Sequence, residues 1–369
     1  MADSVLPQNP QNSPRSRVDK KCRTFGGCWS LFRKLVVRFH LQQTIRHVAP
    51  LVVVLLMTAG RSSAFAWACD GHRAVAMLAE KLLGSATLTA VTAVLTASPV
   101  DPALRRGCEP VPSDLIADVA TWADDERAVD PATAGWHFIN VPRTIGSSPR
   151  DYARYCAGGN CAIDAIVTQF RTLKTSSDRA LRANALRFIL HLIGDLHQPL
   201  HAITNGDRGG NCLPVTYHGQ SPQENDRGDF SPNLHGVWDF STIRTLMTKQ
   251  GLGSARALAD YLAGQETFPH SVAAQEPTSA RVGSWARDAN AQARRVAYGR
   301  LPSPVPLEPS TAHTLGSCLD NHDVARRMLA LHERVDDSYE RFSVPVIVGQ
   351  LQLAAIHLAQ VLKSAFSAP

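Results

Sequence analysis

The sequence predicts an all-α fold, with a single, mainly helical domain over residues 67–369. Apolar residues recur at the 3.6-residue period of a helix in several long segments. The chain is 44% hydrophobic and 19% charged, which is typical of a globular domain with a sizeable core. The proline-rich stretch 302–309 is short and suits a surface loop rather than a linker between domains. No internal repeat is apparent that would favour a solenoid.

The spacing of apolar residues predicts the individual helices. In the first expected helix, Val75, Leu78, Ala79 and Leu82 return to one face every three or four positions. The same rule gives expected helices at 72–83, 114–125, 161–173, 180–196, 235–248, 253–262, 284–298 and 346–366. The segment 211–219 is polar and flanked by glycine, so a short hairpin is expected there.

Residues 1–66 are expected to be a basic leader that ends in a removed signal peptide. They hold ten Lys and Arg against two Asp and Glu, whereas residues 67–369 hold 28 against 30. The net charge of +6 therefore belongs to the leader and does not indicate a nucleic-acid-binding surface. The apolar run 48–59 is short for a membrane span, and Ala64, Phe65 and Ala66 match a signal-peptidase cleavage pattern. Cleavage would expose Trp67; an uncleaved membrane anchor is the alternative.

Six cysteines follow the leader, an even number that favours disulfides in an oxidising compartment. Cys156 and Cys161 enclose a short Gly-Gly-Asn loop and are the expected first pair. Thiolate metal ligands are a less favoured alternative, because the spacing lacks a C-x2-C pattern. The expected location is periplasmic or secreted. The other four cysteines allow three pairings: Cys69, Cys108, Cys212 and Cys318.

The segment 185–201 carries the most informative polar residues. His191 and Asp195 are four residues apart, so a helix places them on one face. Pro199 is expected to end this helix, and His201 follows at the turn. Imidazole and carboxylate groups that converge in this way are ligands for zinc and similar metals.

Further histidines and aspartates recur beside tryptophans. His72 follows Trp67, Asp124 follows Trp122, and His137 follows Trp136. A second His/Asp pair with helical spacing is His235 and Asp239. Each residue alone suits a buried polar role, but five histidines and three aspartates in a few short segments indicate a metal site. His197 would face another side of its helix, which favours a supporting role.

These segments resemble the zinc-dependent single-strand nucleases of the S1/P1 nuclease family. The motifs W-x4-H, W-A-D-x2-R, H-F-I-N, H-x3-D-x-H-Q-P-L-H and L-H-x2-W-D occur in the family's order, from Trp67 to Asp239. The resemblance implies a helical domain with a cluster of three Zn²⁺ ions in a cleft. By that resemblance one ion would take Asp124, His137, His191 and Asp195. A second would share Asp195 and take His72 with the Trp67 α-amino nitrogen and carbonyl oxygen, and a third would take His201, His235 and Asp239.

The same resemblance implies roles in catalysis and substrate binding. Asp195 would bridge two ions, and Arg127 would neutralise charge on the phosphate; a surface salt bridge is the plainer role for Arg127. Phe138 would stack on a base, the alternative being a core position. Asn140 stands where many members carry aspartate, and Asn211 belongs to a Gly-Gly-Asn near the phosphate. The implied substrates are single-stranded DNA and RNA, with 3′-nucleotides alongside, and the implied products carry 5′-phosphates.

Two other functions fit part of the pattern. A zinc-dependent phospholipase C is the alternative enzyme, but the short spacing between Trp67 and His72 and the final His235-x3-Asp239 pair favour the nuclease. A non-catalytic zinc protein is the alternative outside enzymes. The implied ligands leave open coordination positions, which are typical of catalytic zinc.

Overall fold

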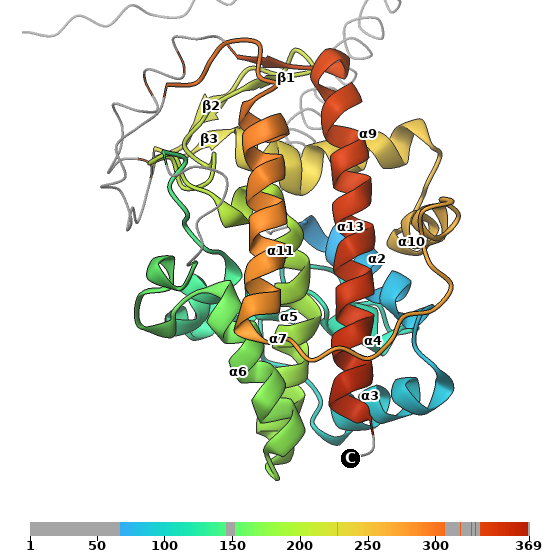
Figure 1. Cartoon of the computed structure of the whole chain (residues 1–369). Coiled ribbons are helices and arrows are strands. Elements are labelled where there is room, and N and C mark those ends of the chain that lie inside the picture. The colour runs from blue at the N-terminus through green and yellow to red at the C-terminus, as the bar shows by residue number, and fades with distance from the viewer. Residues whose placement is uncertain are drawn as a thin grey trace, which may run out of the picture. The chain divides into compact units, whose positions relative to one another are not determined.

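Helix α7 (Arg179–His197) is the buried centre of the fold (Figure 1). The Asp178 carboxylate accepts a hydrogen bond from the Leu181 amide and caps its first turn. Every residue from Ala185 to His197 is buried. The computed structural model describes residues 67–144, 152–226, 228–306, 318, 326, 329 and 333–367. The expected leader, 1–66, lies outside these residues.

The other long helices pack around α7. It contacts α2 (Ala68–Glu80), α3 (Ser85–Ala97), α6 (Ala162–Thr175), α11 (Ser279–Gln292) and α13 (Asp337–Phe366). Helix α10 (Ala255–Ala263) packs against α2 and α13. The buried apolar side chains form one cluster with members from Trp67 to Leu362. The predicted all-α class is confirmed.

Short elements connect these helices. They include α4 (Leu115–Val119), α5 (Trp122–Val129), α8 (Leu234–Gly236), α9 (Thr242–Lys249) and the 3-10 turns η1 (Pro131–His137), η2 (Ala153–Tyr155), η3 (Ala157–Gly159) and η4 (Pro199–Ala202). Two π-helical segments, η5 (Val237–Ser241) and η6 (Ala293–Tyr298), continue neighbouring α-helices. Such π-segments are frequent at functional sites.

The helices expected between residues 84 and 125 need correction. The expected helix 114–125 is two helices, α4 and α5, with a break at 120–121. The break leaves the Ala120 carbonyl to accept a hydrogen bond from His191 Nδ1 at 2.8 Å. Helix α3 was missed, because its sequence is rich in β-branched residues and only Val91 and Leu95 are buried in it.

The hairpin expected at 211–219 is reduced to a tight turn, in which the backbones of Tyr217 and Gln220 exchange two hydrogen bonds. Strand β1 (Thr216–Tyr217) pairs in parallel with β4 (Arg334–Val335), whose residues lie more than a hundred positions further along the chain. The antiparallel pair of strands is β2 (Gln223–Glu224) with β3 (Phe230–Ser231). The sequence pattern carried no information about the distant partner of β1.

Helix α13 begins at Asp337 rather than near residue 346. The Asp336 carboxylate accepts the Ser338 amide hydrogen and caps the start, and Pro345 lies inside the helix without ending it. By length and hydropathy α13 could span a membrane, but half of its most apolar window is buried against the protein. We therefore treat α13 as a core helix.

Three disulfides tie the connections to this core. Cys156 and Cys161 are bonded to each other, as expected, and close the loop before α6. The other two pairs are Cys69–Cys108 and Cys212–Cys318. Because all six cysteines are oxidised, they are not thiolate ligands of a metal. Disulfides are typical of proteins in an oxidising compartment.

His357 on α13 gives the fold a predicted sensitivity to acid. Its ring lies over Trp285 with centroids 4.4 Å apart, and its Nδ1 lies 2.8 Å from His197 Nε2. Burial, with the nearby His197 and Arg281, lowers the pKa of His357 to about 3. Between this value and the ordinary pKa of histidine, the unfolded chain binds a proton that the folded chain does not.

Stability should therefore fall by several kcal/mol as the pH decreases from about 6.5 toward 3. We expect His357→Leu to flatten this slope in urea unfolding curves followed by circular dichroism. An unchanged slope in the variant would show that other groups govern acid unfolding.

Candidate metal centre

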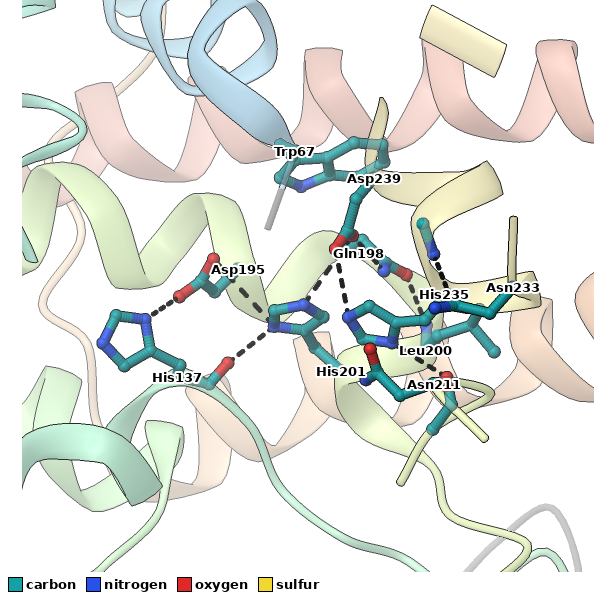
Figure 2. A network of polar contacts seen from close by, with 12 residues as sticks. Trp67, His137, Asp195, Gln198, Leu200, His201, Asn211, Asn233, His235 and Asp239 are labelled. Carbon is teal, nitrogen blue, oxygen red and sulfur yellow. Dashed lines mark hydrogen bonds and ion pairs between the residues drawn. The ribbon is translucent and has the colours of Figure 1, made fainter. Parts of the chain in front are cut away.

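Three groups of buried histidine and aspartate side chains meet beside the C-terminal half of α7. In each group the possible ligand atoms lie within 4.8 Å of one another. Group one is His72, His191 and Asp195, and group two is Asp124, His137 and His191, so that the two groups share His191. Group three is His201, His235 and Asp239. Figure 2 shows group three beside Asp195 and His137.

Asp195 connects all three groups. Its carboxylate lies 3.2 Å from His191 Nε2, 3.3 Å from His72 Nε2 and 2.8 Å from His137 Nδ1. His201 Nδ1, from the third group, is 3.9 Å away. Burial alone would raise the pKa of Asp195, but the charge of His191 and hydrogen bonds from the surrounding histidines hold it well below its ordinary value. A buried carboxylate that stays ionised suits a ligand shared between cations.

His72 reaches α7 because residue 194 is glycine. The His72 and His191 rings are stacked, with centroids 3.8 Å apart and planes 13° from parallel. A Cβ atom on Gly194 would lie 2.9 Å from His72 Nδ1. Burial and the adjacent His191 lower the pKa of His72, whereas Asp195 and Asp124 raise that of His191 to about 9 against the effect of burial. A neutral His72 is the form that can bind a metal.

Backbone carbonyls fix the tautomers of three other histidines. His191 Nδ1 donates to Ala120 O at 2.8 Å, His201 Nδ1 to His137 O at 2.7 Å, and His235 Nδ1 to Gly209 O at 2.8 Å. With Nδ1 bonded to a carbonyl, Nε2 is the ring nitrogen that faces the group and is left to bind a metal. This arrangement is typical of metal-binding histidines.

A turn that contains Gly209 and Gly210, the glycine turn, positions residues of the third group. Gly209 has φ +63°, and a Cβ there would lie 2.4 Å from the Leu200 carbonyl oxygen. The next residue, Gly210, accepts the His235 amide hydrogen at 3.2 Å. The disulfide of Cys212 holds this turn to residue 318. His235 Nε2 lies 3.0 Å from Asp239 Oδ2, across a helix that widens to a π-segment at η5.

The donor set fits metal ions. Several buried nitrogen and oxygen atoms of these groups have no hydrogen-bond partner in the described part of the chain, a costly state unless something else satisfies them. Metal cations would satisfy them, since imidazole and carboxylate are common ligands. The atoms are both ring nitrogens of His72, both oxygens of Asp124, Nε2 of His137, His191 and His201, Oδ1 of Asp195 and Oδ2 of Asp239.

The remaining expected residues surround these groups. The Trp67 side chain is fully buried, and its Nε1 donates to Gly194 O at 2.7 Å, beside Asp195. Arg127 Nη1 lies 3.5 Å from Asp124 Oδ1, with 30% of the Arg127 side chain exposed. Phe138 is 36% exposed, so the core alternative for it is wrong. Asn140 is half-buried, and Asn211 Nδ2 donates to Arg208 O in the glycine turn.

Sequence reasoning missed two supporting residues. Gly194, between His191 and Asp195, makes room for His72. Gln198 is fully buried and donates to the Asp239 carboxylate. Their only sequence signal is their place inside the segment 191–201. Neither residue type would be chosen as a ligand, so only the packed structure shows their contacts.

Comparisons with known proteins identify the family of this chain. The family model for S1/P1 Nuclease matches residues 67–367. The chain is 29% identical over 246 residues to Nuclease S1 of Aspergillus oryzae, covering 61% of this chain and 75% of that protein. It is 28% identical over 244 residues to Nuclease P1 of Penicillium citrinum, with 61% and 79% covered. Endonuclease 5 of Arabidopsis thaliana is 30% identical over 207 residues, with 52% and 62% covered.

The match includes every residue of the three groups, and it favours the nuclease over the phospholipase C and over a non-catalytic protein. The chain belongs to the S1/P1 nuclease family and is a hydrolytic enzyme that acts on phosphodiester bonds.

Proposed function

We propose that this chain is an exported endonuclease, active after removal of residues 1–66, that needs three Zn²⁺ ions. It hydrolyses single-stranded DNA and RNA to products with 5′-phosphates and also removes the phosphate from 3′-nucleotides. The observation that carries the proposal is Asp195, one buried carboxylate surrounded by histidines of all three groups. The disulfides favour export.

The residues of the site have distinct proposed roles. One ion would be held by Asp124, His137, His191 and Asp195. A second ion would be held by His72, Asp195 and the Trp67 terminus, and the third by His201, His235 and Asp239. When bound, such ions lower the pKa of water and offset the charge of the phosphate oxygens. Arg127, beside Asp124, adds a guanidinium that pairs with phosphate oxygens. Phe138 offers a partly exposed ring to an unstacked base, and Asn140 and Asn211 offer amides to the substrate.

The direct experiment is hydrolysis of heat-denatured DNA and of RNA by protein that starts at Trp67. One sample is stripped by a chelator, and part of it is restored with zinc. Cleavage that returns with zinc and leaves 5′-phosphates would support the proposal. No cleavage by protein that has bound three zinc ions would overturn it, and phosphatidylcholine would be the next substrate.

The terminal amine of Trp67 gives a prediction about processing. A peptide nitrogen within a chain is a poor metal donor, whereas a free α-amino group with an ordinary pKa of about 7.7–8.0 is a good one. A protein extended by Ala66 should bind one zinc ion fewer than protein starting at Trp67. Metal content measured by mass spectrometry tests this, with equal content in both proteins as the contradicting result.

A further inference from the structure

Gln198 links residues of the metal centre without being a candidate ligand. It lies between α7 and η4, and its side chain is fully buried (Figure 2). Pro199 restricts Gln198 to an extended backbone, with φ −75° and ψ 117°, so the helix ends there. From this position its side chain reaches Asp239 in η5.

Gln198 donates two hydrogen bonds and accepts two. Its amide donates to Asp195 O and its carbonyl accepts from His201 N, both at 2.9 Å. Its side-chain Oε1 accepts from the Leu200 amide at 2.5 Å, and its Nε2 donates to Asp239 Oδ1 at 2.5 Å. One residue thus connects the shared carboxylate residue, Asp195, with two members of the third group.

The orientation of the Gln198 amide is determined by its partners. The Leu200 amide can only donate, so it requires the side-chain oxygen. The nitrogen is then left to face Asp239, where it donates to Oδ1. The other carboxylate oxygen, Oδ2, has no hydrogen-bond partner among the described residues and lies 3.0 Å from His235 Nε2.

We propose that Gln198 is a positioning residue for the third metal ion: its amide holds Asp239 Oδ1 and so presents Oδ2 to the ion together with His201 and His235. The side-chain oxygen holds the η4 turn that carries His201 at the same time. Hydrogen bonds to a metal-binding carboxylate fix its orientation and typically change metal affinity 10- to 100-fold. The inference rests on the proposed metal-dependent function.

The test is titration of Zn²⁺ into chelator-stripped protein starting at Trp67, with a fluorescent zinc indicator as competitor. Gln198→Glu keeps the side-chain length but sets a second carboxylate against Asp239. We expect it to bind two zinc ions normally and the third about 10- to 100-fold more weakly. Gln198→Met, which removes the donor without adding charge, should weaken the same ion.

Gln352→Glu is the matched control. Gln352 is also a buried glutamine, and its Nε2 donates to Leu262 O at 3.0 Å, but it contacts none of the three groups in the described residues. This variant should retain three zinc ions even if it is less stable. The double variant Gln198→Met with Asp239→Asn should lose less zinc affinity than the sum of the two single losses, because the Gln198 donor acts on the Asp239 carboxylate.

Wild-type affinity for the third ion in both Gln198 variants would overturn the inference. Equal weakening of all three ions would also overturn it, since it would indicate general destabilisation. Additive losses in the double variant would show that Gln198 does not act through Asp239. If the wild-type protein itself did not bind a third ion, the proposed function would fail, a result distinct from any variant-specific outcome.

Discussion

Asp195→Asn is expected to remove zinc from two groups at once. The Asp195 carboxylate lies within 3.3 Å of His72, His137 and His191, so its charge serves both neighbouring groups. An amide keeps the shape but removes the charge and offers one oxygen instead of two. We expect hydrolysis of denatured DNA to fall by more than the roughly 10²–10³-fold that loss of a single electrostatic contact costs.

Asp239→Asn is the matched comparison. Asp239 lies 3.0 Å from His235 and 3.8 Å from His201, and it belongs to one group only. Metal content should therefore fall by one zinc ion in Asp239→Asn and by two in Asp195→Asn. Equal losses would contradict the assignment of Asp195 as the shared ligand.

Gly209→Ala is expected to disrupt the third group and destabilise the fold. A Cβ would lie 2.4 Å from the Leu200 carbonyl oxygen, and backbone cannot move as easily as a flexible side chain. The positive φ adds roughly 1–2 kcal/mol for any residue with a Cβ. Because Gly209 O accepts the His235 ring hydrogen, a shifted turn should also displace His235.

Gly251→Ala separates the two effects. Gly251 has nearly the same φ, +66°, but its Cβ would meet nothing within 4 Å. Urea unfolding should show a loss of about 1–2 kcal/mol for Gly251→Ala and a larger loss for Gly209→Ala. Only Gly209→Ala should lose zinc. Similar stability losses in the two variants would show that the clash with Leu200 is relieved by small movements.

His191 and His72 differ in how much of their placement the spacing of residues in the sequence predicts. His191 and Asp195 share a helix face because they are four residues apart, a relation that the sequence contains completely. His72 comes from another helix; the recurrence of histidine beside tryptophan marked it as a candidate, and only the resemblance to a family grouped it with Asp195. Its stacking on His191 depends on the missing side chain of Gly194, a property of packing between two helices.

The sequence by itself determined the helical class, the Cys156–Cys161 pair and the candidate ligands, because these depend on local periodicity, short loops and residue chemistry. Only the tertiary structure decided how closely the ligands approach one another, how β1 pairs, where the helix at 114–125 breaks and what Gln198 contacts. Those features arise from contacts between residues far apart in the chain. Such contacts are set by burial and by the need to satisfy buried polar atoms, and no local pattern encodes them.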